Sequence, residues 1–191
     1  LSVEPITASA AIMSVDQDDP DNSFSVSDGN IIVNDYGYDM LTVTYGAGGT
    51  ESAPFPATQN ITITGSTTTN TVVVAGGVTA NITLDNVRID LSGAAGYVCA
   101  LDMANATVNL TLVGSNTLKS RGNAGLRAPD GSTLNIGGAG ELTAVARAVS
   151  LGSGVSVCGA GIGGKDGEAG GSITISGGTV RSNGLGRESA G

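Results

Sequence analysis

The stretch NITLDNVRIDL, residues 81–91, places apolar side chains at alternate positions on both sides of an Asp-Asn pair. The stretch NLTLVGSNTLK, residues 109–119, repeats this pattern around Gly-Ser-Asn. A period of two is typical of a strand with one buried face, and Asn and Gly favour tight turns. Each stretch therefore predicts a strand, a tight turn and a second strand.

The first apolar–polar–apolar triplet of these stretches recurs at uneven intervals. It occurs at Ile61-Thr62-Ile63, Ile82-Thr83-Leu84, Leu110-Thr111-Leu112, Leu134-Asn135-Ile136 and Ile173-Thr174-Ile175. Short apolar segments at Leu101, Leu126 and Ile162 precede the last three copies and suggest a third strand in each unit. Such repeats, with no helix signal, predict an all-β fold, specifically a right-handed parallel β-helix (β-solenoid). A β-sandwich is the alternative, because its strands and turns would alternate similarly.

Charge and aromatic content divide the chain of 191 residues in two. Residues 1–57 hold nine of the 17 acidic groups, no Lys or Arg, and five of the six aromatic residues, so they carry the whole net charge of −9. A stack of coils needs a cover at its end, where apolar side chains and strand edges are exposed. We therefore expect an N-terminal acidic arm and cap at 1–57, followed by β-helix coils at 58–191.

Residue counts exclude several classes of function. Without His there is no Ser-His-Asp triad and no His-ligated zinc. The acidic balance disfavours nucleic acid, and no apolar stretch is long enough to span a membrane. Arg88 lies between Asp85 and Asp90, and Asp102 follows them. β-Helical polysaccharide lyases use Arg and Asp side chains, but the spacing of Arg88 and Asp90 here favours a surface ion pair. We expect no enzymatic activity and no catalytic residues.

The two cysteines leave an alternative open. Cys99 and Cys158 each follow a Val in an apolar stretch. They are compatible with one disulfide or with two buried thiols.

Two glycine-rich motifs carry a resemblance to a known family. They are Gly-Ala-Gly-Ile-Gly-Gly at 159–164 and the strand followed by Gly-Gly-Thr-Val at 171–180. With the repeats, residues 58–184 resemble secreted β-helical repeat proteins of Gram-positive bacteria, a cell-surface and carbohydrate-binding-like group. The resemblance implies a β-helix on the outside of a bacterial cell and implies no defined activity.

The leading functional hypothesis is a structural subunit of the cell surface: a fibre, stalk or adhesin segment that associates head to tail into a homo-oligomer or filament. The last coil has no visible cap, and residues 1–15 are apolar enough to donate a strand to the open coil of another copy. The expected association residues are Val3, Ile6, Ile12, Met13, Val15, Val180 and Leu185.

The alternative is a calcium-dependent module that binds surface polysaccharide. Carboxylates are the ligands that Ca²⁺ prefers, and the expected site is Asp16, Asp18, Asp19 and Asp21. The expected sugar-stacking residues are Tyr36, Tyr38 and Tyr45. No cofactor other than Ca²⁺ is expected. The outward threonines also suggest ice binding, but Asn135 and the uneven coil lengths argue against it.

Overall fold

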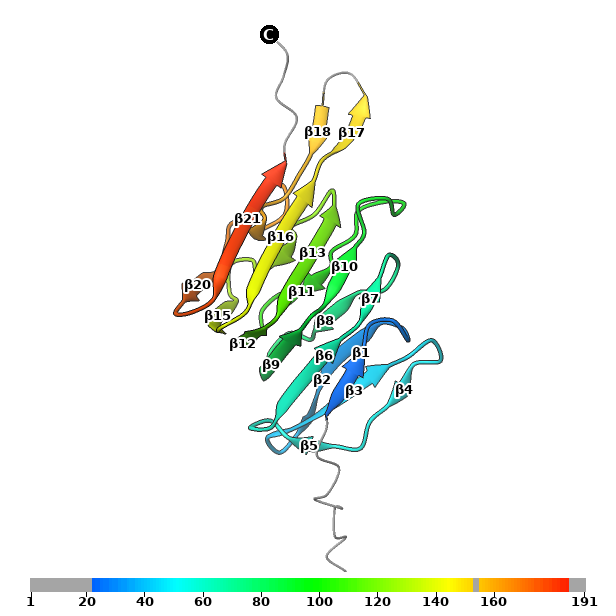
Figure 1. Ribbon diagram of the computed structural model, residues 1–191, viewed down its shortest axis with the longest axis vertical. Coiled ribbons are helices and arrows are strands. Elements are labelled where there is room, and N and C mark those ends of the chain that lie inside the picture. Colours follow the sequence, from blue (N-terminus) through cyan, green and yellow to red (C-terminus); the bar gives the residue numbers. More distant parts are fainter. Residues whose placement is uncertain (1–21, 153–154, 186–191) are drawn as a thin grey trace, which may run out of the picture.

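A computed structural model describes residues 22–152 and 155–185, and the described chain is all-β without a helix. Its strands form three main sheets, in which consecutive strands of each sheet come from consecutive passes of the chain (Figure 1). No helix in the described part is long and apolar enough to cross a membrane.

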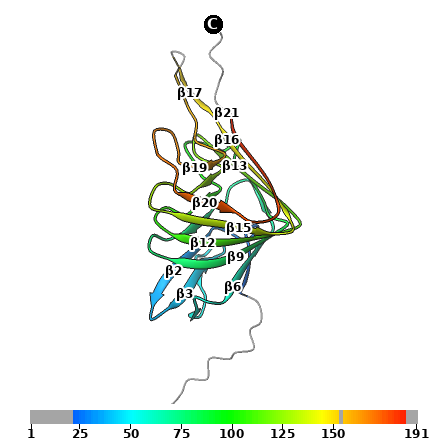
Figure 2. The ribbon, with the colours of Figure 1, turned by 90° about the vertical axis from the view of Figure 1, so that its left-hand side faces the viewer.

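Sheet A contains six parallel strands. The strands from β6 to β20 lie one above another in Figure 2. They are β1 (Ser23–Ser25), β6 (Asn60–Thr64), β9 (Thr79–Asp85), β12 (Thr107–Val113), β15 (Thr133–Gly138) and β20 (Ser172–Ile175). All five predicted triplets lie in this sheet.

Sheet C contains the five parallel strands that follow those of sheet A along the chain. They are β7 (Ser66–Thr67), β10 (Arg88–Asp90), β13 (Ser115–Arg121), β16 (Glu141–Arg147) and β21 (Thr179–Leu185). Sheet B contains β2 (Ile31–Gly37), which follows β1 directly, and the third strand of the next four passes: β8 (Val72–Val74), β11 (Leu101–Asp102), β14 (Leu126–Arg127) and β19 (Ile162–Gly163). The predicted three strands per unit are therefore confirmed.

Antiparallel strands extend sheet B at its N-terminal edge. They are β3 (Met40–Tyr45), which pairs with β2, and β4 (Thr50–Glu51) and β5 (Phe55–Pro56), which pair with β3. Parallel pairing itself begins at β1 and β2, upstream of the boundary predicted at residue 58.

Apolar side chains stack in columns between the sheets. In sheet A, Ile61, Ile82, Leu110 and Ile136 occupy one register position on successive strands and are at most 2% exposed. Each added strand extends the column by about 4.8 Å, so the core grows with every pass of the chain. This stacking explains why the same triplet recurs in the sequence.

The corner between sheets A and C requires a left-handed backbone in most passes. Gly65, Asn86, Gly114 and Gly178 stand there with φ of 90°, 53°, 62° and 76°. Gly and Asn tolerate this conformation best, which accounts for the turn residues found beside each triplet.

Insertions between sheets C and B, and one between sheets B and A, account for the uneven repeat length. Residues 92–98 form a loop after β10, and an antiparallel hairpin of β17 (Val149–Gly152) and β18 (Val155–Val157) follows β16. A loop at 164–171 then joins β19 to β20. Because these segments lie outside the strands, the register of the sheets is not interrupted.

Both cysteines are free. Leu101, Leu126 and Ile162 share one register position in sheet B, so Cys99 and Cys158 lie on passes two strands apart. Two strand spacings are about 9.6 Å, which exceeds the roughly 7 Å limit between the Cα atoms of a disulfide. The open alternative is therefore resolved in favour of two thiols.

Candidate functional site

The last strand of each sheet forms a C-terminal edge, which we define as β19, β20 and β21. Ile173 and Ile175 continue the columns of Leu134 and Ile136, but they are 37% and 53% exposed, whereas the two preceding residues are almost fully buried. In the described residues, this edge pairs on one side only. It thus combines unpaired backbone groups with apolar side chains in register with the core.

The structure separates the predicted association residues. Val180 is half-buried and packs against the core, in register with Leu142. Leu185 is 53% exposed and is paired with Arg147, which lies on the outer face of sheet C. The predicted donors Val3, Ile6, Ile12, Met13 and Val15 lie outside the described residues. Ile173 and Ile175 were not among the predicted association residues, although they belong to the final triplet.

The two other predicted sites have different outcomes. Asp16, Asp18, Asp19 and Asp21 lie outside the described residues, within which no group of three or more potential metal ligands occurs. Tyr36 and Tyr38 stand at the β2–β3 hairpin and are 58% and 98% exposed. Tyr45 lies at the opposite end of β3 and packs on Phe24, with ring centroids 5.0 Å apart. The three tyrosines therefore do not form one stacking platform.

The ion pair expected around Arg88 is confirmed. Its guanidinium lies 3.2 Å from the carboxylate of Asp90, which also accepts a hydrogen bond from Lys119 at 3.1 Å. A hydrogen bond donated by the Ser92 hydroxyl is the main reason that the pKa of Asp90 lies below its ordinary value. Asp102 is not part of this group.

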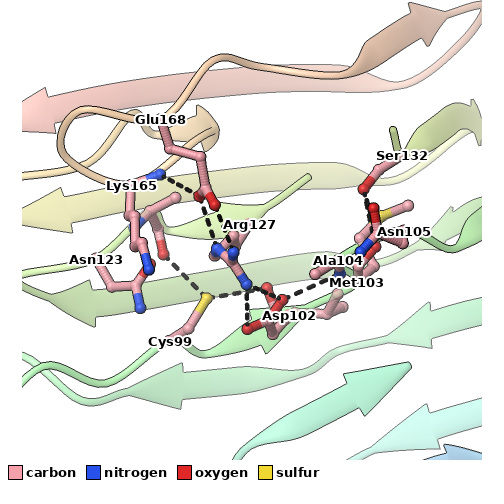
Figure 3. A network of polar contacts seen from close by, with 12 residues as sticks. Cys99, Asp102, Met103, Ala104, Asn105, Asn123, Arg127, Ser132, Lys165 and Glu168 are labelled. Carbon is pink, nitrogen blue, oxygen red and sulfur yellow. Dashed lines mark hydrogen bonds and ion pairs between the residues drawn. The ribbon is translucent and has the colours of Figure 1, made fainter. Parts of the chain in front are cut away.

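Asp102 belongs to a separate network on the outer face of sheet B (Figure 3). Arg127 on β14 donates hydrogen bonds to both carboxylate oxygens of Asp102, at 3.0 and 2.9 Å. It also donates to both oxygens of Glu168 in the 164–171 loop, at 2.9 and 2.6 Å. One guanidinium thus joins two neighbouring strands to a loop 41 residues away.

Electrostatics hold this network in its charged form. Hydrogen bonds from Arg127 lower the pKa of Glu168 to about 2, and the Glu168 bonds in turn raise the pKa of Arg127. Beneath the network, burial raises the pKa of the Cys99 thiol to about 12, and the charge of Asp102 adds to the effect. A thiol with such a pKa is a poor nucleophile at neutral pH.

A pocket of about 400 Å³ opens beside the network. It is lined by Tyr97, Gly122, Asn123, Val157, Lys165 and Asp166. Tyr97 is 52% exposed, and the Lys165 ammonium has no ion-pair partner among the described residues. The arrangement offers an aromatic face, an amide and two opposite charges to a polar ligand. This site was not predicted from the sequence, although Tyr97 is the one aromatic residue after position 57.

Comparisons with protein families, curated proteins and solved structures found no match. The fold and the sites described above are therefore the basis for any functional assignment.

Proposed function

We propose that the chain is a right-handed parallel β-helix that serves as a non-enzymatic structural segment of a bacterial cell surface and extends by association at its C-terminal edge. The repeated order of sheets A, C and B supports the β-helix, and parallel connections are right-handed in almost all proteins. The extracellular location rests on the resemblance of residues 58–184 to secreted β-helical repeat proteins.

The exposed edge is the observation that carries this proposal. A strand added beside β20 would complete its hydrogen bonds and cover Ile173 and Ile175. Burial of each half-exposed Ile side chain stabilises the association by about 1 kcal/mol, before backbone pairing is included. The occupant is a second copy of this chain, and the proposed donor is the arm that contains Val3, Ile6 and Ile12. Such a head-to-tail contact does not close, so it produces filaments.

The test compares two substitutions of exposed apolar residues in the full chain. Ile175→Asp places a carboxylate on the edge, whereas Val155→Asp places one on the β17–β18 hairpin, where the original side chain is 55% exposed. Light scattering after gel filtration and negative-stain electron microscopy give the mass and form of the particles. We expect oligomers or filaments for the unchanged chain and for Val155→Asp, and monomers for Ile175→Asp. A monomeric unchanged chain at high concentration contradicts the association.

Removal of residues 1–15 tests the donor separately. Filaments that persist without this segment would show that the arm is not the donor, while the edge itself would still be the association site.

The Tyr97 pocket supports a second candidate function, the binding of polysaccharide. Tyrosine faces and nearby amide and charged groups are suited to a ligand that is apolar on one side and hydroxylated on the other. Tyr97→Ala should abolish retention on insoluble polysaccharides, whereas Tyr38→Ala, at the distant hairpin, should preserve it. Loss of binding on addition of a calcium chelator would support the proposed Asp16–Asp21 calcium site; binding unaffected by chelator would contradict it.

A further inference from the structure

The outer face of sheet A differs from the other sheet faces in carrying almost no charge. Asp85, at the end of β9, is the one ionisable residue in its six strands. By contrast, the strands of sheet C contain seven: Arg88, Asp90, Lys119, Arg121, Glu141, Arg147 and Arg181. Apart from Asp85 and Val113, which are paired at the ends of β9 and β12, the outward side chains of sheet A are instead hydroxyls and amides.

These outward side chains form three parallel rows that run across the strands. In register, the rows are Thr79, Thr107 and Thr133; Asn60, Asn81, Asn109 and Asn135; and Thr62, Thr83 and Thr111. Each row advances by one strand spacing per pass of the chain. The face is therefore a two-dimensional array rather than a single stripe.

Hydrogen bonds along the middle row fix the array. Asn135 donates to Asn109, and Asn109 donates to Asn81, both at 3.0 Å. Asn81 donates in turn to the carbonyl of Thr58 at 3.2 Å, and Thr83 donates to Asn60 at 3.0 Å. Amide ladders of this kind hold each side chain in one orientation. The spacing of the outer polar atoms is thus set by the backbone.

Such a face is not suited to bind a small dissolved ligand. It has no aromatic side chain among its outward positions. Hydrogen bonds from exposed hydroxyls merely replace equivalent bonds to water, so their net contribution is small. An extended solid whose own hydrogen-bonding groups repeat at the spacing of the array could engage many of these groups at once.

The array spacing is close to that of ice. Along the rows the spacing is about 4.8 Å, and along a strand alternate side chains are about 6.6 Å apart. Water molecules joined tetrahedrally by hydrogen bonds of about 2.75 Å have second neighbours about 4.5 Å apart and a layer repeat of about 7.3 Å. The differences are about 0.3 Å and 0.7 Å per step. Over the three steps of the longest row and the two steps between the outer rows they amount to about 0.9 Å and about 1.4 Å, at most about half a hydrogen-bond length. We propose that the outer face of sheet A binds ice.

Both sequence arguments against ice binding are answered by the register. The uneven coil lengths arise from loops and a hairpin outside the strands, which leave the three rows aligned. Asn135 does not interrupt a threonine row, because it is paired with Asn109 in the asparagine row. The interruption expected at Asn135 is therefore wrong; the row of Thr62, Thr83 and Thr111 ends instead at Gly137, which is paired with Thr111.

The experiment measures thermal hysteresis and ice-crystal shape with the full chain and two variants. Thr111→Tyr raises a bulky side chain from the array at an exposed strand position, where aromatic residues are well tolerated. Thr117→Tyr is the matched control, because Thr117 lies on the outer face of sheet C in the same pass of the chain. Circular dichroism checks that both variants are folded.

We expect a measurable hysteresis gap and faceted crystals for the unchanged chain and for Thr117→Tyr, and loss of both for Thr111→Tyr. Freezing behaviour of the unchanged chain equal to that of albumin at the same concentration overturns the proposal. Equal activity of the two variants also overturns it, because the array would then not be the ice-binding face.

Discussion

Replacement of Asn116 should destabilise the fold more than replacement of any exposed asparagine. Asn116 is 1% exposed and points inward from β13, in register with the apolar residues Leu142 and Val180. Its side-chain oxygen accepts a hydrogen bond from the Val87 N–H at 2.9 Å. Its amide group donates to the carbonyls of Val113 and Glu141, at 3.0 and 3.1 Å. One side chain therefore joins three successive passes of the chain.

The cost follows from the three bonds. Asn116→Ala removes all of them, and at a net 0.5–1.5 kcal/mol each the loss is about 3 kcal/mol. Asn116→Leu restores apolar volume at a position where the next coil has Leu142. However, it leaves the buried Val87 N–H without a partner, so we expect a net loss of about 2 kcal/mol. The control Asn135→Ala removes one donated bond on the outer face of sheet A and should cost about 0.5 kcal/mol.

Urea unfolding followed by far-ultraviolet circular dichroism measures these differences. With a slope of about 3 kcal/mol per molar urea, a loss of 3 kcal/mol lowers the midpoint by about 1 M. If Asn116→Leu is as stable as the unchanged chain, apolar stacking alone determines this column and the reasoning is refuted.

Three further changes have defined outcomes. The pKa of Glu168 is about 2 in the folded chain against an ordinary 4.5. Its ion pair therefore stabilises the fold fully above pH 4.5, and this stabilisation is lost as the pH falls towards 2. Glu168→Gln should reduce this acid dependence of the free energy of unfolding by at most about 3 kcal/mol, measured in urea titrations across that pH range. Gly114→Ala places a Cβ 2.2 Å from the side-chain oxygen of Asn86, at φ 62°. It should lower the melting temperature more than the control Gly96→Ala, which has φ 77° and open space around the new Cβ. Equal decreases in melting temperature would mean that the corner relaxes freely. In a thiol titration at pH 8, Cys99 should react only after unfolding, whereas the less buried Cys158 should react in the folded chain. Mass spectrometry of the labelled peptides identifies which cysteine has reacted.

The sequence predicted the strand repeat because the repeat is a direct consequence of stacking. The triplets that begin at Ile61, Ile82 and Leu110 occupy equivalent register positions in sheet A, whereas those that begin at Leu134 and Ile173 are displaced from them by two residues. Leu101, Leu126 and Ile162 are aligned in sheet B as expected. The first parallel strand was harder to predict from the sequence, because β1 is only three residues long and has Ser on both sides of Phe24. A short strand of this kind carries too little periodicity to identify.

The residues of the candidate sites were harder to predict because their positions depend on the insertions. Arg127 meets Asp102 across one strand spacing, which the repeat register predicts once the units are aligned. Its contact with Glu168 depends on how the 164–171 loop folds back over sheet B, and no local pattern encodes that path. The Tyr97 pocket likewise requires a loop, a corner and a hairpin from three different passes.

The stacking rule also restricts which residues can occupy the outer faces. Strands in register place equivalent side chains about 4.8 Å apart, a separation at which like charges repel and hydroxyls or amides can bond to one another. Asn rows satisfy themselves, as in sheet A, whereas a carboxylate needs a cation on the next strand, as Asp102 has in Arg127. The in-register arginines Arg121 and Arg147 are an exception, and there Arg121 donates at 2.7 Å to the carbonyl of Ala94 in the 92–98 loop. Loops thus allow charged groups at positions where in-register rows alone would disfavour them. This explains why the Tyr97 pocket, with its charged Lys165 and Asp166, lies among insertions, whereas the uncharged array lies on sheet A.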